Sequence, residues 1–120
     1  GGELGAGHRI TALYELVPES GGDFDDPWLT VRLRYKAPDG EESTLLEYPA
    51  GQEQVQTELS ADFSFAAGVA QTGMLLRGSE YSGTSTYQDV ITRLKALPGI
   101  TEDPYKEEFL YLLSKLNRSR

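Results

Sequence analysis

The stretch SADFSFAAGVAQTGMLLR, residues 60–77, predicts a helix that is apolar around most of its circumference. One side carries Phe63, Ala66, Ala67, Ala70, Gly73 and Met74, which Phe65, Val69 and Leu76 extend, and the polar strip is only Ser64, Gln71 and Thr72. A helix this apolar normally packs on more than one side. Ser60 is a suitable N-cap and Gly78 a suitable C-terminal stop, so the helix has defined ends.

Small residues within this stretch indicate close packing. Gly68 and Gly73, together with the alanines, would let neighbouring backbones approach the helix closely. Glycine inside a helix costs about 1 kcal/mol relative to alanine, which tight packing has to offset. We therefore expect a central packing helix, in which Ala70→Leu would destabilise the fold by overpacking.

Upstream of this helix the pattern changes to that of a β-hairpin. In the stretch WLTVRLRYKA, residues 28–37, apolar and polar residues alternate as in a sheet with one wet face. Asp39-Gly40 is a strong hairpin signal, because glycine tolerates the positive φ of a two-residue turn. That turn sets a register in which Tyr35 faces Thr44, Leu33 faces Leu46, Arg32 faces Glu47 and Val31 faces Tyr48. The register pairs apolar residues on one face and opposite charges on the other, which supports it independently.

Two weaker patterns suggest further strands. Residues 8–17 (HRITALYELV) alternate and are rich in residues that favour strands. Residues 52–59 (QEQVQTEL) alternate weakly, which indicates an edge strand or an extended connection. We therefore expect a small antiparallel sheet of three to four strands. Its edges would need cover from a loop or from strands of a neighbouring domain.

Two more helices follow the central one. Ser85 and Gln88 have the spacing of a capping box, and Asp103-Pro104 opens the last helix. The expected buried stripes are Tyr87, Val90, Ile91, Leu94 and Leu97 in the second helix, and Tyr105, Phe109, Leu112, Leu113 and Leu116 in the third. The fold class is thus α+β, in one domain over residues 1–120 that is mainly strands over 1–59 and mainly helices over 60–120.

Composition limits the classes of function. The net charge is −8, from 19 acidic and 11 basic residues, which opposes binding to nucleic acid or to anionic lipid. The chain has no cysteine, and therefore no disulfide or Cys-ligated zinc. No apolar run approaches the ~20 residues of a membrane span, so we expect no direct insertion by this fragment.

Few residues offer chemistry. His8 is the only histidine and has no identifiable catalytic partner, so we interpret it as a polar residue at a strand end. Asp23, Asp25 and Asp26 supply oxygens that could bind Ca²⁺, but they lack the glycine and the distant glutamate of an EF-hand. We favour a solvated loop there and predict no catalytic, cofactor-binding or metal-binding residue.

The remaining polar clusters have structural explanations. Turn and cap positions account for the hydroxyls of Ser79, Ser82, Thr84, Ser85 and Thr86, and Gly5-Ala6-Gly7 neither follows a strand nor precedes a helix, as a phosphate loop would. The basic row, Arg32, Arg34 and Lys36, either contacts an anionic partner or is the wet face of the hairpin. We interpret Tyr81 and Tyr87 as residues of turn and core packing rather than as the lining of a ligand pocket.

Four strings together resemble a known family. They are GAGHRITALYELVP at 5–18, LTVRLRYKAPDG at 29–40, LLEYP at 45–49 and DFSFAAGVAQTGMLLRGSEYSG at 62–83. They resemble the uncharacterised C-terminal domain that follows a von Willebrand factor type A domain in bacterial secreted or lipid-anchored proteins. The metal-binding D-x-S-x-S motif of the type A domain does not occur here, so the resemblance transfers no site residue.

The resemblance implies a C-terminal fragment of a larger, extracytoplasmic protein. We expect a non-catalytic structural or protein-interaction module without cofactor, whose partners are the upstream type A domain and another protein. The alternative is a small-molecule-binding or hydrolytic domain that uses a pocket near His8 or the loop of residues 23–26. A closed pocket with His8 beside a carboxylate would favour the enzyme, and an exposed apolar patch would favour the module.

Overall fold

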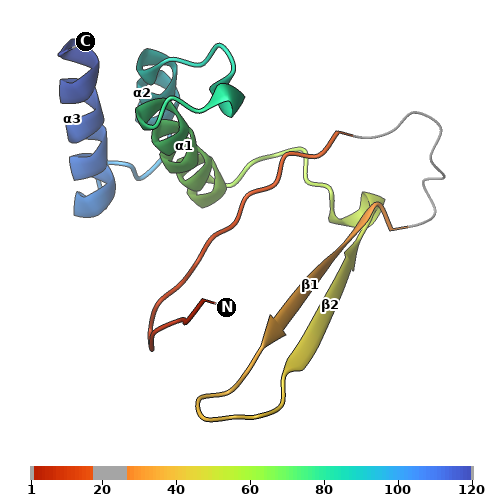
Figure 1. The fold of residues 1–120 in the computed structure, drawn as a ribbon. Coiled ribbons are helices and arrows are strands. Elements are labelled where there is room, and N and C mark those ends of the chain that lie inside the picture. Colours follow the sequence, from red (N-terminus) through yellow and green to blue (C-terminus); the bar gives the residue numbers. More distant parts are fainter. Residues whose placement is uncertain (1, 18–26, 120) are drawn as a thin grey trace. The chain divides into compact units, whose positions relative to one another are not determined.

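A computed structural model describes residues 2–17 and 27–119 of the chain. Its elements, in order, are β1 (Leu29–Tyr35), β2 (Thr44–Ala50), the 3-10 turn η1 (Gln52–Gln54), α1 (Ala61–Leu76), the 3-10 turn η2 (Glu80–Ser82), α2 (Tyr87–Lys95) and α3 (Pro104–Arg118) (Figure 1). This order confirms the α+β class. Contacts divide the chain into a hairpin unit, residues 16–58, and a helical unit, residues 1–15 and 59–120, and each unit is described by itself.

The hairpin has the register that the sequence predicts. β1 and β2 run antiparallel, with Val31 opposite Tyr48, Leu33 opposite Leu46 and Arg32 opposite Glu47. The Arg32 guanidinium Nε donates to the Glu47 carboxylate at 2.5 Å, across the wet face of the pair.

The turn itself differs from the predicted two-residue turn. The strands end at Tyr35 and Thr44, and the Gly40 N–H donates to the Ala37 carbonyl at 3.0 Å within the connection. The residue with a positive φ is Asp39, at 59°, and not Gly40. Proline at the second position and a positive φ at the third are the marks of a type II turn. The register is unaffected, because the connection is centred on Asp39-Gly40 and a turn of any symmetrical length about that centre pairs the same residues.

The strand count of three to four is not confirmed. Within the described residues the sheet has two strands, and residues 8–17 form none. Ile10 and Tyr14 are exposed there, and neither of the two described strands pairs with this alternating segment. Instead of the expected extended segment after β2, η1 begins with the Gln54 side chain accepting the Gly51 N–H at 2.7 Å, which favours a helical turn.

The ends of α1 are as predicted. The Ser60 hydroxyl caps it by accepting the Phe63 N–H at 3.1 Å, and Gly78 after its end has φ 64°. The face that α1 buries is only partly the predicted one, since Phe65 packs against the core as expected but other members of the predicted side do not. Phe63, Val69 and Leu76 are exposed, and so is Ala70. The expectation that Ala70 is tightly packed is therefore wrong.

The buried residues of α1 are Gly68 and Thr72, and Gly68 lies against Leu94 of α2. A Cβ at Gly68 would lie 2.8 Å from Leu94 Cδ2, so a side chain there would force Leu94 to shift, whereas Gly73 has open space around it. Thr72 is only 4% exposed, and its hydroxyl donates to the Gly68 carbonyl at 2.8 Å. Because that hydroxyl is satisfied within the helix, its burial costs little.

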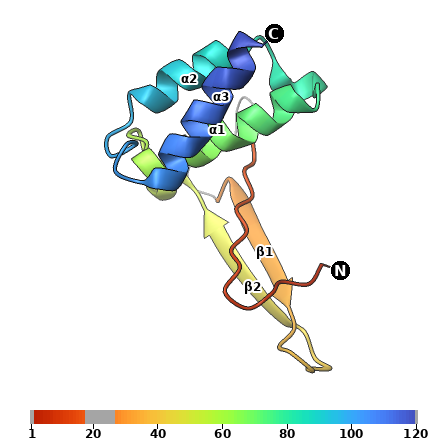
Figure 2. The same cartoon turned by 90° about the vertical axis from the view of Figure 1, so that its left-hand side faces the viewer.

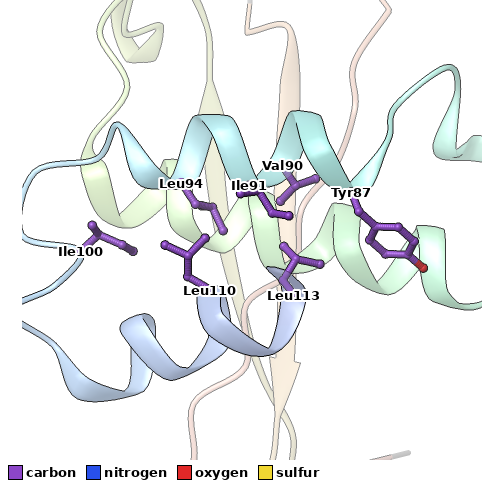
Figure 3. Packing of buried hydrophobic residues seen from close by; sticks show 7 residues of the cluster. All are labelled: Tyr87, Val90, Ile91, Leu94, Ile100, Leu110 and Leu113. Carbon is purple, nitrogen blue, oxygen red and sulfur yellow. The ribbon is translucent and has the colours of Figure 1, made fainter. Parts of the chain in front are cut away.

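The core of the helical unit is centred on α2 rather than on α1. Figure 3 shows the α2 side chains meeting those of α3, and the buried set is Tyr87, Val90, Ile91, Leu94, Ile100, Leu110 and Leu113. Val90 and Leu94, at 0% and 1% exposed, are the most buried large side chains. The stripe predicted for this helix is correct. Its cap is one residue later than predicted: the Thr86 hydroxyl accepts the Asp89 N–H, and the Asp89 carboxylate accepts the Thr86 N–H at 2.8 Å.

α3 begins as predicted, with the Asp103 carboxylate accepting the Tyr105 N–H at 2.9 Å and Pro104 in the first turn. Its buried face is rotated from the predicted one. Leu110, absent from the expected stripe, is buried, whereas Tyr105 and Leu112 are exposed. Figure 2 shows α1, α2 and α3 packed together. Among the described residues, none of the helices has the length and apolar character of a membrane span.

Candidate interaction surface

The residues predicted to offer chemistry do not come together in the described part of the chain. His8 is exposed, and its backbone N–H donates to the Gly5 carbonyl at 3.1 Å. Gly7 in the same turn has φ 77°. Residues 2–17 and 27–119 contain no group of three or more His, Asp and Glu side chains that could hold a metal ion. Asp23, Asp25 and Asp26, the calcium candidates, lie outside the described residues.

The hydroxyl cluster serves turns and caps. Ser79 accepts the Tyr81 N–H at 3.3 Å, Ser82 donates to the Ser79 carbonyl at 2.7 Å, and Ser85 receives a hydrogen bond from the Gln71 amide. Tyr81 is exposed, whereas Tyr87 belongs to the core. The two tyrosines therefore do not line a common pocket.

One face of the hairpin is apolar and open. This hairpin apolar face consists of Leu29, Val31, Leu33 and Tyr35 from β1 and Thr44, Leu46, Tyr48 and Ala50 from β2. Val31 is 40% exposed, Leu33 52%, and Tyr35 and Tyr48 53% each. Large contiguous apolar surface of this kind marks sites at which proteins bind one another.

The opposite face of the hairpin carries the basic row. Arg32 pairs with Glu47, and the Arg34 Nη1 donates to the Ser43 hydroxyl at 2.8 Å. Lys36 follows the end of β1 and is exposed. Within residues 27–58, one of the three cations thus has an anionic partner across the strands, and neither Arg34 nor Lys36 forms an ion pair there.

The helical unit has an apolar groove between α1 and α3. Its volume is about 160 Å³, and its lining residues are Thr72, Leu76, Phe109, Leu112, Leu113 and Leu116. The two helices also meet through the rings of Phe65 and Phe109, edge to face at 5.7 Å. Thr72 is the one polar side chain among the described residues that line the groove, and such a lining suits an apolar side chain.

An ion pair joins the beginnings of α1 and α3. The Lys106 ammonium donates to the Asp62 carboxylate at 2.7 Å and lies 5.3 Å from the centre of the Phe65 ring. The hydrogen bond and charge of Lys106 lower the pKa of Asp62, and the Asp62 hydrogen bond raises the pKa of Lys106. Within α2, hydrogen bonds from Thr86 lower the pKa of Asp89. These shifts belong to caps and pairs that fix helix ends.

Sequence reasoning identified the alternation of the hairpin but not that its apolar side would be open. The sequence pattern indicated three to four strands, whereas the described sheet has two, and two strands bury little surface by themselves. The groove was not predicted, because it depends on how far apart α1 and α3 lie when both pack on α2.

Comparison with known proteins places the chain in a family. A family model described as the C-terminal part of the uncharacterized protein YfbK matches residues 1–118. The uncharacterized protein YfbK of Escherichia coli strain K12 is 31% identical to this chain in an alignment 131 residues long. The alignment covers 93% of this chain and 22% of that protein. No solved structure matches. The chain therefore belongs to the family of YfbK C-terminal domains.

Proposed function

We propose that this chain is a non-catalytic interaction module that attaches to another part of a longer protein, with a von Willebrand factor type A domain as the part it serves. The hairpin apolar face is the observation that carries this proposal. A second protein bound at the same face is the other partner that the module would accommodate.

The energetics of the hairpin support this role. An isolated two-stranded hairpin is only marginally stable in water, and β1 and β2 leave Leu33, Tyr35 and Tyr48 about half exposed. Covering apolar surface contributes about 25 cal/mol per Å². A partner on this face would therefore stabilise the hairpin and gain affinity from the same contact.

The family relationship supports a partner within the same polypeptide. The chain spans 22% of the length of the E. coli relative, so most of that protein lies outside the matched region. The resemblance to domains that follow a type A domain in secreted or lipid-anchored proteins supports an extracytoplasmic location. The net charge of −8 supports a protein partner over nucleic acid.

Single cysteines provide a direct test, because the chain has none of its own. Leu33→Cys reports on the hairpin apolar face, and Arg34→Cys, on the opposite face of the same strand, is the matched control. Each variant is labelled with a maleimide in the chain of residues 1–120 and in the longer protein that contains it, and the labelled peptide is quantified by mass spectrometry. We expect labelling at Leu33→Cys to be much slower in the longer protein, and labelling at Arg34→Cys to change less.

Equal labelling rates for Leu33→Cys in the two proteins would show that the face remains open, and the proposal would be wrong. If labelling slows in the longer protein, the same experiment after deletion of its type A domain identifies the surface that covers the hairpin. Restored fast labelling assigns that surface to the type A domain, and continued protection assigns it to another part.

A further inference from the structure

The outward main-chain groups of β1 follow from one hydrogen bond. The Ala50 carbonyl faces β1, because it accepts the Trp28 N–H at 2.8 Å. Successive residues of a strand turn their main-chain groups to opposite sides. Pro49, Glu47 and Leu45 therefore turn theirs away from β1, and so do their partners on β1, which are Thr30, Arg32 and Arg34.

The two edges of the hairpin are consequently unequal. On the outer edge of β2, Pro49 has no N–H to donate to an added strand, and proline is typical of an edge that remains unpaired. On the outer edge of β1, Thr30, Arg32 and Arg34 all carry an N–H and a carbonyl. The β1 outer edge is thus the one suited to strand addition.

The side chains beside that edge specify the chemistry of the added strand. A strand paired with β1 would place alternate side chains next to Arg32 and Arg34 on the wet face, and the others next to Val31 and Leu33 on the hairpin apolar face. Like charges directly opposite each other are destabilising, which disfavours pairing of β1 with β1 of a second copy. Acidic side chains on one face and apolar side chains on the other complement both sets.

We infer that the β1 outer edge accepts an extended segment of the longer protein that alternates apolar and acidic residues, and so adds a third strand to the hairpin. This inference rests on the proposed function and specifies how the module binds. The basic row then selects the segment, since among the described residues of the hairpin Arg34 and Lys36 form no ion pair.

Two capped peptides as long as β1 provide the test, one alternating valine with glutamate and one alternating valine with lysine. We expect the glutamate peptide to bind the 1–120 chain and the lysine peptide to bind roughly tenfold or more weakly. In NMR spectra, the amide signals of Thr30, Arg32 and Arg34 should shift more than those of Leu45 and Glu47. Equal affinities, or shifts confined to β2, would overturn the inference.

A charge reversal on β1 sharpens the test. Arg34→Glu should reduce the preference for the glutamate peptide or reverse it, while Lys95→Glu changes the net charge equally on α2 and should leave the preference unchanged. An equal response to both substitutions would mean that only overall charge matters, contrary to the inference. A dimer of the unliganded chain with these amides protected would show that a second copy occupies the edge instead.

The two proposals fail in different ways. Protection of Leu33→Cys in the longer protein without peptide binding at β1 would mean that a partner covers the face without adding a strand. Peptide binding at β1 without protection of Leu33→Cys would support strand addition at the β1 outer edge, but it would contradict the proposal that a partner covers the hairpin apolar face.

Discussion

The helical unit and the hairpin unit have equally regular apolar patterns but bury them to very different degrees. In the helical unit, α2 places Val90, Ile91 and Leu94 in a core that α3 completes. In the hairpin unit, Leu33, Tyr35 and Tyr48 remain about half exposed, and Leu29 and Leu46 are only partly buried. An apolar pattern thus indicates that a segment packs against a partner, but that partner need not belong to the same unit.

The largest expected effect tests whether stability resides in the α2 core. Leu94→Ala should lower the free energy of unfolding by about 2–5 kcal/mol, because it leaves a cavity where Leu94 is 1% exposed. Leu33→Ala, in the hairpin apolar face, should cost less than about 1 kcal/mol. Urea denaturation measures both, with helical circular dichroism reporting on the helical unit and the amide NMR signals of β1 and β2 reporting on the hairpin. Similar losses for the two variants would contradict the contrast between the units.

Two glycines of α1 offer a matched pair with opposite expected signs. Gly68→Ala should destabilise by about 1–3 kcal/mol, because its Cβ would lie 2.8 Å from Leu94 Cδ2 in a packed core. Gly73→Ala has open space and should stabilise by up to about 1 kcal/mol through helix propensity. Urea midpoints compare the two variants. Stabilisation by both would mean that α1 and α2 are less closely packed than the structure has them.

The cap of α2 should have a smaller effect. Thr86→Ala removes the hydroxyl that accepts the Asp89 N–H and should cost about 1 kcal/mol, whereas the exposed Thr84→Ala should be nearly neutral. Because the pKa of Asp89 is lowered on folding, its contribution is complete above the ordinary carboxyl pKa and is lost as the pH falls through the lowered value. Thr86→Ala should therefore also weaken the loss of melting temperature in acid. An unchanged acid profile would show that the cap does not act through Asp89.

The smallest expected effect concerns the exposed pair of Asp62 and Lys106. The pKa of Asp62 is lowered and that of Lys106 is raised, so the stabilisation should disappear in acid through Asp62 and in strong base through Lys106. Asp62→Asn should lower the melting temperature slightly near neutral pH. It should also remove the part of the loss of melting temperature in acid and in strong base that comes from this ion pair. High salt should reduce the difference between variant and parent. A difference that grew with salt would be inconsistent with an ion pair.

Helix caps and the hairpin register were predictable from the sequence, because each depends on a few neighbouring residues. Ser60 and Asp103 cap their helices as expected, because a cap requires only a short polar side chain and the next three residues. The hairpin register followed from the position of Asp39-Gly40 at the centre of the pattern. The Thr86 cap was missed by one residue, since Ser85 and Thr86 offer equivalent hydroxyls to the same helix.

Features that depend on distant partners were not predictable. The buried face of α1 could be recognised only in part. Phe65, which the sequence placed on the apolar side, packs against the core, whereas hydrophobicity favours the exposed Phe63 and Val69 over the buried Gly68 and Thr72. The alternation of residues 8–17 indicates strand preference but cannot supply the strand to pair with. For the candidate surface, the basic row was visible in the sequence, whereas the direction of the Ala50 carbonyl, which distinguishes the edges, required the structure.

The connection between β1 and β2 has a consequence for changes in its length. Since it is centred between Asp39 and Gly40, insertion or removal of residues in pairs about that point leaves every cross-strand partner unchanged. A change by one residue that passed into the pairing would turn the side chains of one strand to the opposite face, and would bring the basic row against apolar neighbours. Loop variants of this hairpin should therefore obey a parity rule, in which even changes are tolerated and odd ones must be absorbed by the turn.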